Sequence, residues 1–430
     1  METVEQRPFG FWTAVAFVIG GVIGAGIYVV PGSFAAYGWS GALAWVAGGA
    51  GALIIGRVLA TLTASRPQAP GLVAVIGLEL GPIAGVLVGW GAWVSYWCAN
   101  AYIALTSARY AGQIMPGLAA TPLRQAMTAT LLMVALTLLN LSGLKSSGRF
   151  QVVTTALKLL PLFAVVLIAG MMALGDHAAF TATPHAPVAF APLLSATALT
   201  MVAIIGFESA SIAAERIRDP ERNVMRATMT GIVLSCLLYL VVCTAITFTV
   251  PAAELSASNA PVALFIEWHW GRWAGDFVAA FAVISTVGCL NVWVLLQSEI
   301  PLGLARAGQL PSWFGKTNAR DIATLPLVLG SVLTCALLLI GSYRSGAALM
   351  DFMLRLTAAS GLWIYAFAGL AAIKARVRPV LALLSLLFSL AMVVGSGTEA
   401  ALLSIALMAI ALPLYAMTRR ATASAEQPAE

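Results

Sequence analysis

The chain has 430 residues, of which 60% are hydrophobic and only 9% are charged, and its formal net charge is +6. Soluble domains carry charges on about a quarter of their residues, so this composition excludes a soluble enzyme, a soluble nucleic-acid-binding protein and a disordered chain. A membrane-spanning helix needs about 20 apolar residues. The sequence therefore predicts an all-α, polytopic membrane protein.

Apolar runs separated by polar breaks predict twelve transmembrane helices. In chain order they cover about 11–30, 40–64, 82–111, 123–142, 150–174, 194–213, 226–250, 274–298, 324–343, 346–374, 378–395 and 398–418. The semi-polar segments 66–80, 252–272 and 301–316 are expected to form short helices at the membrane interface. Residues 1–418 are thus predicted to form one transmembrane domain, and the polar residues 419–430 a disordered cytoplasmic tail.

Twelve spans put both chain ends on one side of the membrane, and the positions of Lys and Arg indicate which side. Of the 23 Lys and Arg residues, four fall on the opposite side and three fall within spans (Arg57, Lys158 and Arg355), which leaves sixteen on the side of the termini. Such an excess marks the cytoplasmic side. We therefore expect cytoplasmic termini in a bacterial inner membrane, and no nucleic-acid partner is needed to explain the basic charge.

Two predicted spans contain interruptions near their middle. The first carries four glycines within residues 20–26, and the sixth carries Gly206 followed by the carboxylate Glu208. Interrupted helices at membrane depth persist where they line a cavity or lie buried in protein, and paired interruptions are typical of secondary transporters with inverted repeats. The alternative for the first span is close helix packing through small residues.

Such interruptions favour a small zwitterionic ligand. Free amides at a helix start attract an anionic group, and free carbonyls at a helix end attract a cationic one. No nucleotide-binding G-x-x-x-x-G-K-[ST] loop is present, and the cysteines and histidines show neither metal-ligand nor catalytic spacing. We therefore expect no cofactor, no metal and no catalytic residues, and transport driven by a gradient or by exchange.

Three segments together resemble a known superfamily. GGVIGAGIYVVPGSFAAYG at 20–38, GFESASIAAERIRDPERNVMRAT at 206–228 and GQLPSWF at 308–314 are similar to the amino acid–polyamine–organocation superfamily, and within it to the basic amino acid/polyamine antiporters. The resemblance implies a LeuT-type fold with a 5+5 inverted repeat, about 11–174 and 194–374, and two extra helices, 378–418. It also implies that the chain can pair as a homodimer through the last spans.

The resemblance also assigns substrate-binding positions. It implies that the amides of Ala25 and Gly26 bind a substrate carboxylate, and that main-chain carbonyls bind the amino group; these carbonyls belong to Val22, Val202 and Ile205. Asn100 matches a substrate-contacting asparagine, and Trp293 an aromatic residue that packs on the substrate. Thr357 roughly replaces a serine of the family.

Two departures from the family put arginine specificity in doubt. Val202 stands where the arginine-specific members have a tryptophan, and Ala25 stands where they have a serine. Recognition of an amino acid by main-chain groups is unaffected by either change. The substrate side chain is therefore left open.

Ionisable residues within spans are functional candidates by default. The resemblance relates Glu208 to gating and pH response, although Glu208 could instead attract a cationic substrate or bond to unwound backbone. Lys158 could carry a proton or occupy the place of a bound cation, or it could extend its ammonium to the membrane interface. Asp351 and Arg355 are expected to form an i,i+4 pair; the alternative, in which Arg355 contacts substrate, would favour an acidic substrate.

The sequence thus predicts a secondary transporter that exchanges amino acids or their decarboxylated amines (polyamines) by alternating access. Its partners would be the small-molecule substrate, protons and membrane lipid. The alternative is a proton-coupled symporter of neutral amino acids from the same superfamily.

Overall fold

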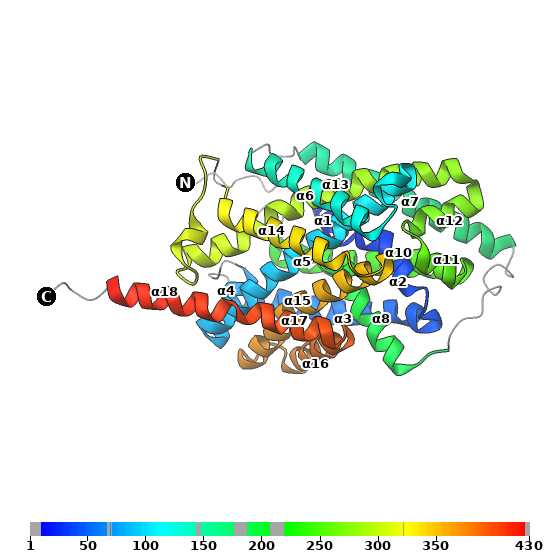
Figure 1. Cartoon of the computed structure of the whole chain (residues 1–430). Coiled ribbons are helices and arrows are strands. Elements are labelled where there is room, and N and C mark those ends of the chain that lie inside the picture. The colour runs from blue at the N-terminus through cyan, green and yellow to red at the C-terminus, as the bar shows by residue number, and fades with distance from the viewer. Residues whose placement is uncertain are drawn as a thin grey trace.

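The structure, a computed structural model, is almost entirely helical over the residues that it describes (Figure 1). It describes residues 10–66, 69, 71–142, 148–175, 187–206, 219–320 and 322–425. The side chains described exclude those of 16, 17, 21, 148–158, 220, 221 and 421–425. Within the described ranges, β-structure is limited to a single bridge between Thr317 and Ala323.

The first half of the chain contains eight α-helices and one short 3-10 helix among the described residues. They are α1 (Phe11–Val22), α2 (Gly26–Phe34), α3 (Gly38–Ala64), α4 (Leu72–Leu80), α5 (Pro82–Ile114), η1 (Pro116–Leu118), α6 (Pro122–Leu141), α7 (Gly148–Gly175) and α8 (Phe190–Ile204). The remaining described elements are α10 (Pro220–Thr249), α11 (Ala252–Ala257), α12 (Pro261–Trp270), α13 (Arg272–Arg306), η4 (Ser312–Gly315), α14 (Thr324–Gly341), α15 (Gly346–Lys374), α16 (Pro379–Gly395), α17 (Thr398–Ala409) and α18 (Ala411–Ala425).

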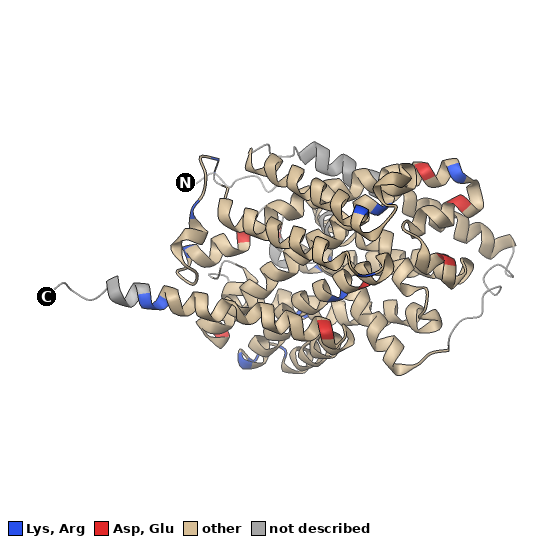
Figure 2. Ribbon diagram, viewed as in Figure 1, with Lys and Arg blue, Asp and Glu red and all other residues tan. Residues whose placement is uncertain are grey.

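Seven helical segments among the described residues are long and apolar enough to cross a membrane, and four shorter apolar helices accompany them. Figure 2 shows that charged residues are sparse along the helices, and many large apolar side chains are exposed on them. Exposed apolar surface of this extent is stable only in contact with lipid. The prediction of an all-helical, polytopic membrane protein is therefore confirmed, and the number of twelve spans stays a prediction.

Helix α5 lies at the centre of the bundle and explains part of the difference in the number of spans. It has 33 residues but is not among the seven apolar segments. Most of its residues are buried, and it packs against both α13 and α15. A helix that faces protein on nearly all sides needs no lipid-compatible surface, so small and polar residues are tolerated there.

Two sequence predictions need correction. The segment 301–316 was expected to form a separate interfacial helix, but α13 continues through Pro301 to Arg306, and only η4 is separate. Residues 419–430 were expected to be a disordered tail, but α18 continues through Ala425 and extends past the other helices (Figure 1). Residues 426–430 lie outside the described residues. The short helices α4, α11 and α12 fall within the other two predicted interfacial segments.

Candidate functional site

The interruption predicted in the first span is present. Helix α1 ends at Val22 and α2 begins at Gly26, so three residues between them are not helical. Ile23 leaves the helical region with φ −75° and ψ 88°. The amide of Gly24 donates to the carbonyl of Val22 at 2.9 Å, which closes a tight turn in place of a helical hydrogen bond.

The carbonyl of Val22 has a second partner. The hydroxyl of Tyr239, a fully buried residue of α10, donates to this oxygen at 2.8 Å. A carbonyl oxygen has two lone pairs, and here Gly24 and Tyr239 engage both. A ligand amino group could bind to this oxygen only by sharing it with these donors or by displacing one of them.

The helix of the sixth predicted span ends at the position where an interruption was expected. Helix α8 ends at Ile204, and Ile205 is extended with φ −51° and ψ 135°. Gly206 has φ 111°, a backbone conformation that glycine adopts without the steric penalty of a side chain. The continuation of this span, which includes Glu208, lies outside the described residues.

The two interruptions are in direct contact. A Cβ atom added to Gly26 would lie 3.2 Å from the Cα and 3.3 Å from the Cβ of Ala203. A Cβ atom on Gly24 would meet the Sγ of Cys289 in α13 at 3.6 Å. The start of α2 therefore packs closely on the last turn of α8, and only a residue without a side chain fits at Gly26 without displacing Ala203.

A small cavity of about 10 Å³ lies between the interruptions. This volume accommodates about one water molecule, so the cavity is closed to an amino acid in this conformation. The residues that line it come from α1, α2, α5, α8, α13 and α15 and the two interruptions: Val22, Gly24, Gly26, Ser95, Ala99, Tyr102, Val202, Ala203, Ile205, Cys289, Trp293 and Thr357. All of these side chains are uncharged.

Six of the eight substrate-binding positions predicted from the sequence line this cavity, namely Val22, Gly26, Val202, Ile205, Trp293 and Thr357. The other two do not. Ala25 is buried beside the cavity-lining glycines. Asn100 is fully buried, and its Nδ2 donates to Oε1 of Gln297 in α13 at 2.8 Å, while its Oδ1 has no hydrogen-bond partner among the described residues.

Polar and aromatic contacts fix the wall of the cavity opposite the interruptions. The hydroxyl of Ser95 in α5 donates to the carbonyl of Thr357 in α15 at 3.2 Å. The ring of Trp293 meets the ring of Tyr96 edge to face, with centroids 5.1 Å apart. These contacts join α5 to α15 and to α13. The cavity-lining side chains of the three helices therefore keep fixed positions relative to one another.

Sequence reasoning missed several residues of the cavity wall, among them Ser95, Ala99, Tyr102 and Cys289. A periodic signal for them exists, because positions 95, 99 and 102 follow the i, i+4, i+7 spacing of one helix face, and Cys289 lies four residues before Trp293. The spacing defines a face of each helix. It does not indicate which face meets the interruptions.

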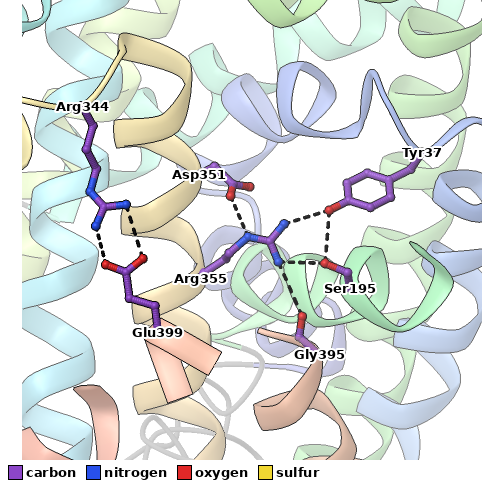
Figure 3. A network of polar contacts seen from close by, with 7 residues as sticks. All are labelled: Tyr37, Ser195, Arg344, Asp351, Arg355, Gly395 and Glu399. Carbon is purple, nitrogen blue, oxygen red and sulfur yellow. Dashed lines mark hydrogen bonds and ion pairs between the residues drawn. The ribbon is translucent and has the colours of Figure 1, made fainter. Parts of the chain in front are cut away.

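Outside the cavity, Arg355 of α15 is the centre of a polar network (Figure 3). Its Nε donates to Oδ2 of Asp351 at 2.6 Å, which confirms the predicted i,i+4 pair. Its other nitrogens donate to the hydroxyl of Ser195 at 2.8 Å, to the hydroxyl of Tyr37 at 2.8 Å and to the carbonyl of Gly395 at 3.5 Å. One side chain thereby joins α15 to α8, to α16 and to the connection between α2 and α3.

Arg355 does not line the cavity, whereas Thr357, two residues later, does. Residues two apart point in nearly opposite directions from a helix. In this conformation, the guanidinium of Arg355 is therefore bound to other parts of the protein. A second ion pair, between Arg344 and Glu399, lies nearby and is more exposed (Figure 3).

Lys158 belongs to helix α7, but its side chain lies outside the described ones. The described residues contain no group of three or more His, Cys, Asp or Glu side chains with metal-binding geometry. The five cysteines, all of which lie within the described ranges, form no disulfide bond.

Comparison with known proteins identifies a matching family and several relatives of this chain. Residues 9–424 match the family model of amino acid permeases. A putative arginine/ornithine antiporter of Bacillus subtilis (strain 168) is 27% identical over 359 residues, which are 77% of this chain and 76% of the relative. The cadaverine/lysine antiporter of Escherichia coli (strain K12) is 25% identical over 349 residues, 80% of this chain and 77% of the relative. An arginine/ornithine antiporter of Pseudomonas aeruginosa is 28% identical over 356 residues, which are 80% of this chain and 73% of the relative.

Proposed function

The chain belongs to the amino acid permease family, a family of transporters and not of enzymes, and from this premise we propose that it exchanges amino acids or their decarboxylated amines across the bacterial inner membrane. The observation that carries the proposal is the packing of two interrupted helices around one cavity. Free amides and carbonyls at such interruptions suit the carboxylate and ammonium of an amino acid.

In this proposal the substrate carboxylate binds near the amides of Ala25 and Gly26, and its ammonium near carbonyls of Val22, Val202 and Ile205. Trp293 packs on the substrate side chain, and Thr357 adds a polar contact. Asn100, which does not line the cavity in this conformation, would add a second one only after the surrounding helices rearrange. Support comes from the positions of Gly26, Val202, Ile205 and Trp293 in the cavity wall. The oxygen of Val22 would have to be shared with its present donors, Gly24 and Tyr239, or one of these donors would have to be displaced by the substrate.

The small cavity volume implies that binding requires a change of conformation. An amino acid does not fit into about 10 Å³, so the helices around the cavity must separate toward one side of the membrane to admit it. Alternating access then needs different affinities for substrate in the inward-open and outward-open states. We propose that the inverted repeat, the twelve spans and the homodimer implied by the resemblance in sequence apply here as well.

Exchange is tested with the purified protein in liposomes. Counterflow of radiolabelled arginine, lysine, ornithine, cadaverine and neutral amino acids, each against itself, would identify the substrate that the protein exchanges. We expect Trp293→Ala to reduce this counterflow at least tenfold, because the aromatic surface that covers the substrate is removed. Tyr343→Ala, at an exposed position outside the cavity, is the control and should exchange at the wild-type rate. Failure of every amino acid and amine to exchange would refute the proposal.

The second candidate is proton-coupled symport of a neutral amino acid. It is favoured by the uncharged side chains of all described residues that line the cavity, because a cationic substrate side chain would be stabilised by an acidic one. Uptake into substrate-free liposomes under an imposed pH gradient would distinguish symport from exchange. Either mechanism could use Glu208 or Lys158 for proton coupling, and a pH–rate profile unchanged in Lys158→Ala would remove Lys158 from that role.

A further inference from the structure

A second cleft lies apart from the cavity described above. It measures about 600 Å³ and lies between α1, α3 and the first turns of α10. It shares no lining residue with the cavity between the interrupted helices. Its walls are formed by Phe11, Arg57, Asn223, Met225, Arg226, Met229 and Thr230.

The helices around this cleft pack tightly against one another beyond Thr230, and they are farther apart between Thr230 and Phe11, where the cleft lies. A Cβ atom on Gly231 of α10 would lie only 2.5 Å from Cγ1 of Val18 in α1. A Cβ atom on Gly49 of α3 would lie 3.2 Å from Sγ of Cys236 in α10. Close packing therefore ends next to Thr230, and the cleft occupies the space from there to Phe11, the first residue of α1.

The two arginines of the cleft lie at similar depth in the bundle. Arg57 lies seven residues before the end of α3, and Arg226 six residues after the start of α10. At 1.5 Å per residue, each Cα lies roughly 10 Å inside its helix end. Because α3 ends on the side where α1 and α10 begin, both guanidinium groups face the same end of the cleft.

Among the described residues that line this cleft, none carries a negative charge to compensate its two arginines. Neither Arg57 nor Arg226 forms an ion pair with a described residue, and no acidic residue is among those that line the cleft. Two like charges that share a cleft repel each other, and partial burial of Arg57 weakens its hydration. An anion between them would relieve both effects and accept the charge-assisted hydrogen bonds that guanidinium groups give to phosphate.

The rest of the wall indicates the kind of anion. Phe11, Met225 and Met229 add apolar surface beside the two guanidinium groups. Basic clefts between spanning helices on the cytoplasmic side suit anionic lipid headgroups, with acyl chains along neighbouring apolar side chains. We propose that this cleft binds the phosphate headgroup of an anionic phospholipid from the cytoplasmic leaflet.

The test uses the full-length protein, purified in a neutral detergent. Phosphatidylglycerol, phosphatidylcholine and inorganic phosphate are titrated separately, and the melting temperature and the lipid retained in native mass spectrometry are measured. We expect phosphatidylglycerol to raise the melting temperature and to be retained, whereas phosphatidylcholine and inorganic phosphate have little effect. Arg57→Gln and Arg226→Gln should each weaken this binding about tenfold, the usual effect of losing one charge-assisted hydrogen bond.

Arg222→Gln is the matched control, because Arg222 lies on the first turn of α10 but does not line the cleft. It should bind the lipid like the wild type. If a glutamine variant fails to fold, Arg57→Lys retains the charge and should bind the lipid more weakly than the wild type. Equal binding of the two lipids, or unchanged binding in the double glutamine variant, would overturn the proposal. A response to inorganic phosphate as large as that to lipid would identify a site for a soluble anion instead.

Discussion

At the scale of single residues, Gly26 is the position where the two interruptions meet. Its neighbour Ala203 leaves no room for a side chain, because an added Cβ would lie 3.2 Å from the Cα of Ala203. The constraint is one of space and not of backbone conformation, since Gly26 starts a regular helix.

We therefore predict that Gly26→Val displaces α2 from α8 and lowers substrate exchange at least tenfold, while the protein still folds. Overpacking of this kind typically costs about 1–3 kcal/mol. Counterflow in liposomes and thermal unfolding of the same preparation measure both effects. Gly170→Ala is the control, because an added Cβ there meets nothing within 4 Å. Wild-type exchange by Gly26→Val would show that the contact is unimportant for transport.

Tyr239 provides a second test at the residue scale. Its hydroxyl donates to Val22 at the end of α1, and its ring packs on Trp45 with centroids 5.0 Å apart. Tyr239→Phe keeps the ring and removes the hydrogen bond, so we expect a loss of about 1 kcal/mol in the free energy of unfolding.

The same variant should also change the KM for substrate several-fold, because the carbonyl of Val22 loses the donor that orients it. Tyr110→Phe is the matched control. The hydroxyl of Tyr110 donates to the carbonyl of Tyr28, within α2 and not in the interruption, and it accepts from the amide of Val262. It should lose stability without a change in KM. Equal KM changes in both variants would contradict a specific role for Tyr239.

At the scale of elements, the network of Arg355 connects parts of the chain that lie far apart in sequence. It joins α15 to α8, α16 and the α2–α3 connection through three hydrogen-bond acceptors, and a fourth acceptor, Asp351, lies on α15 itself. Helix α8 and α2 also carry the two interruptions. Any motion that separates α8 from α15 on this side of the cavity must therefore break the bonds of Arg355.

We predict that Arg355→Ala favours the conformation that is open on this side. Cys289 lines the cavity, so its modification by a membrane-impermeant thiol reagent added outside should become faster in Arg355→Ala. Stability should fall by about 2 kcal/mol, because the half-buried Asp351 loses its partner. Arg344→Ala breaks the more exposed pair with Glu399 and should change neither quantity by much. Unchanged labelling of Cys289 would exclude Arg355 from control of access.

The elements also show what could be predicted from the sequence. The interruptions were predictable because a cluster of glycines within an apolar run strongly favours a break in the helix, and a helix end is a local property. The end of α13 was not, because the semi-polar residues 301–316 suggested a separate interfacial helix, whereas α13 continues through Pro301 to Arg306. Likewise, Ser95, Tyr102 and Cys289 line the cavity because of how α5 and α13 are rotated, which depends on packing between distant segments.

At the scale of the whole molecule, the distribution of Lys and Arg predicts the orientation in the membrane. We expect a fluorescent protein fused after Ala425 to fluoresce, and alkaline phosphatase at the same place to be inactive, because this end should be cytoplasmic. Fusions after Arg344, in the turn between α14 and α15, should give the opposite result. The same pattern from both sites would contradict the predicted orientation.

The cavity between the interrupted helices holds about one water molecule. A hydrated ion that entered it would have to shed nearly its whole shell of water, at a cost of several kcal/mol or more. In this conformation the protein should therefore act as an electrical insulator. A cell could then hold many copies of the protein without an ion leak through them. Charge would cross the membrane through this protein only together with transported substrate.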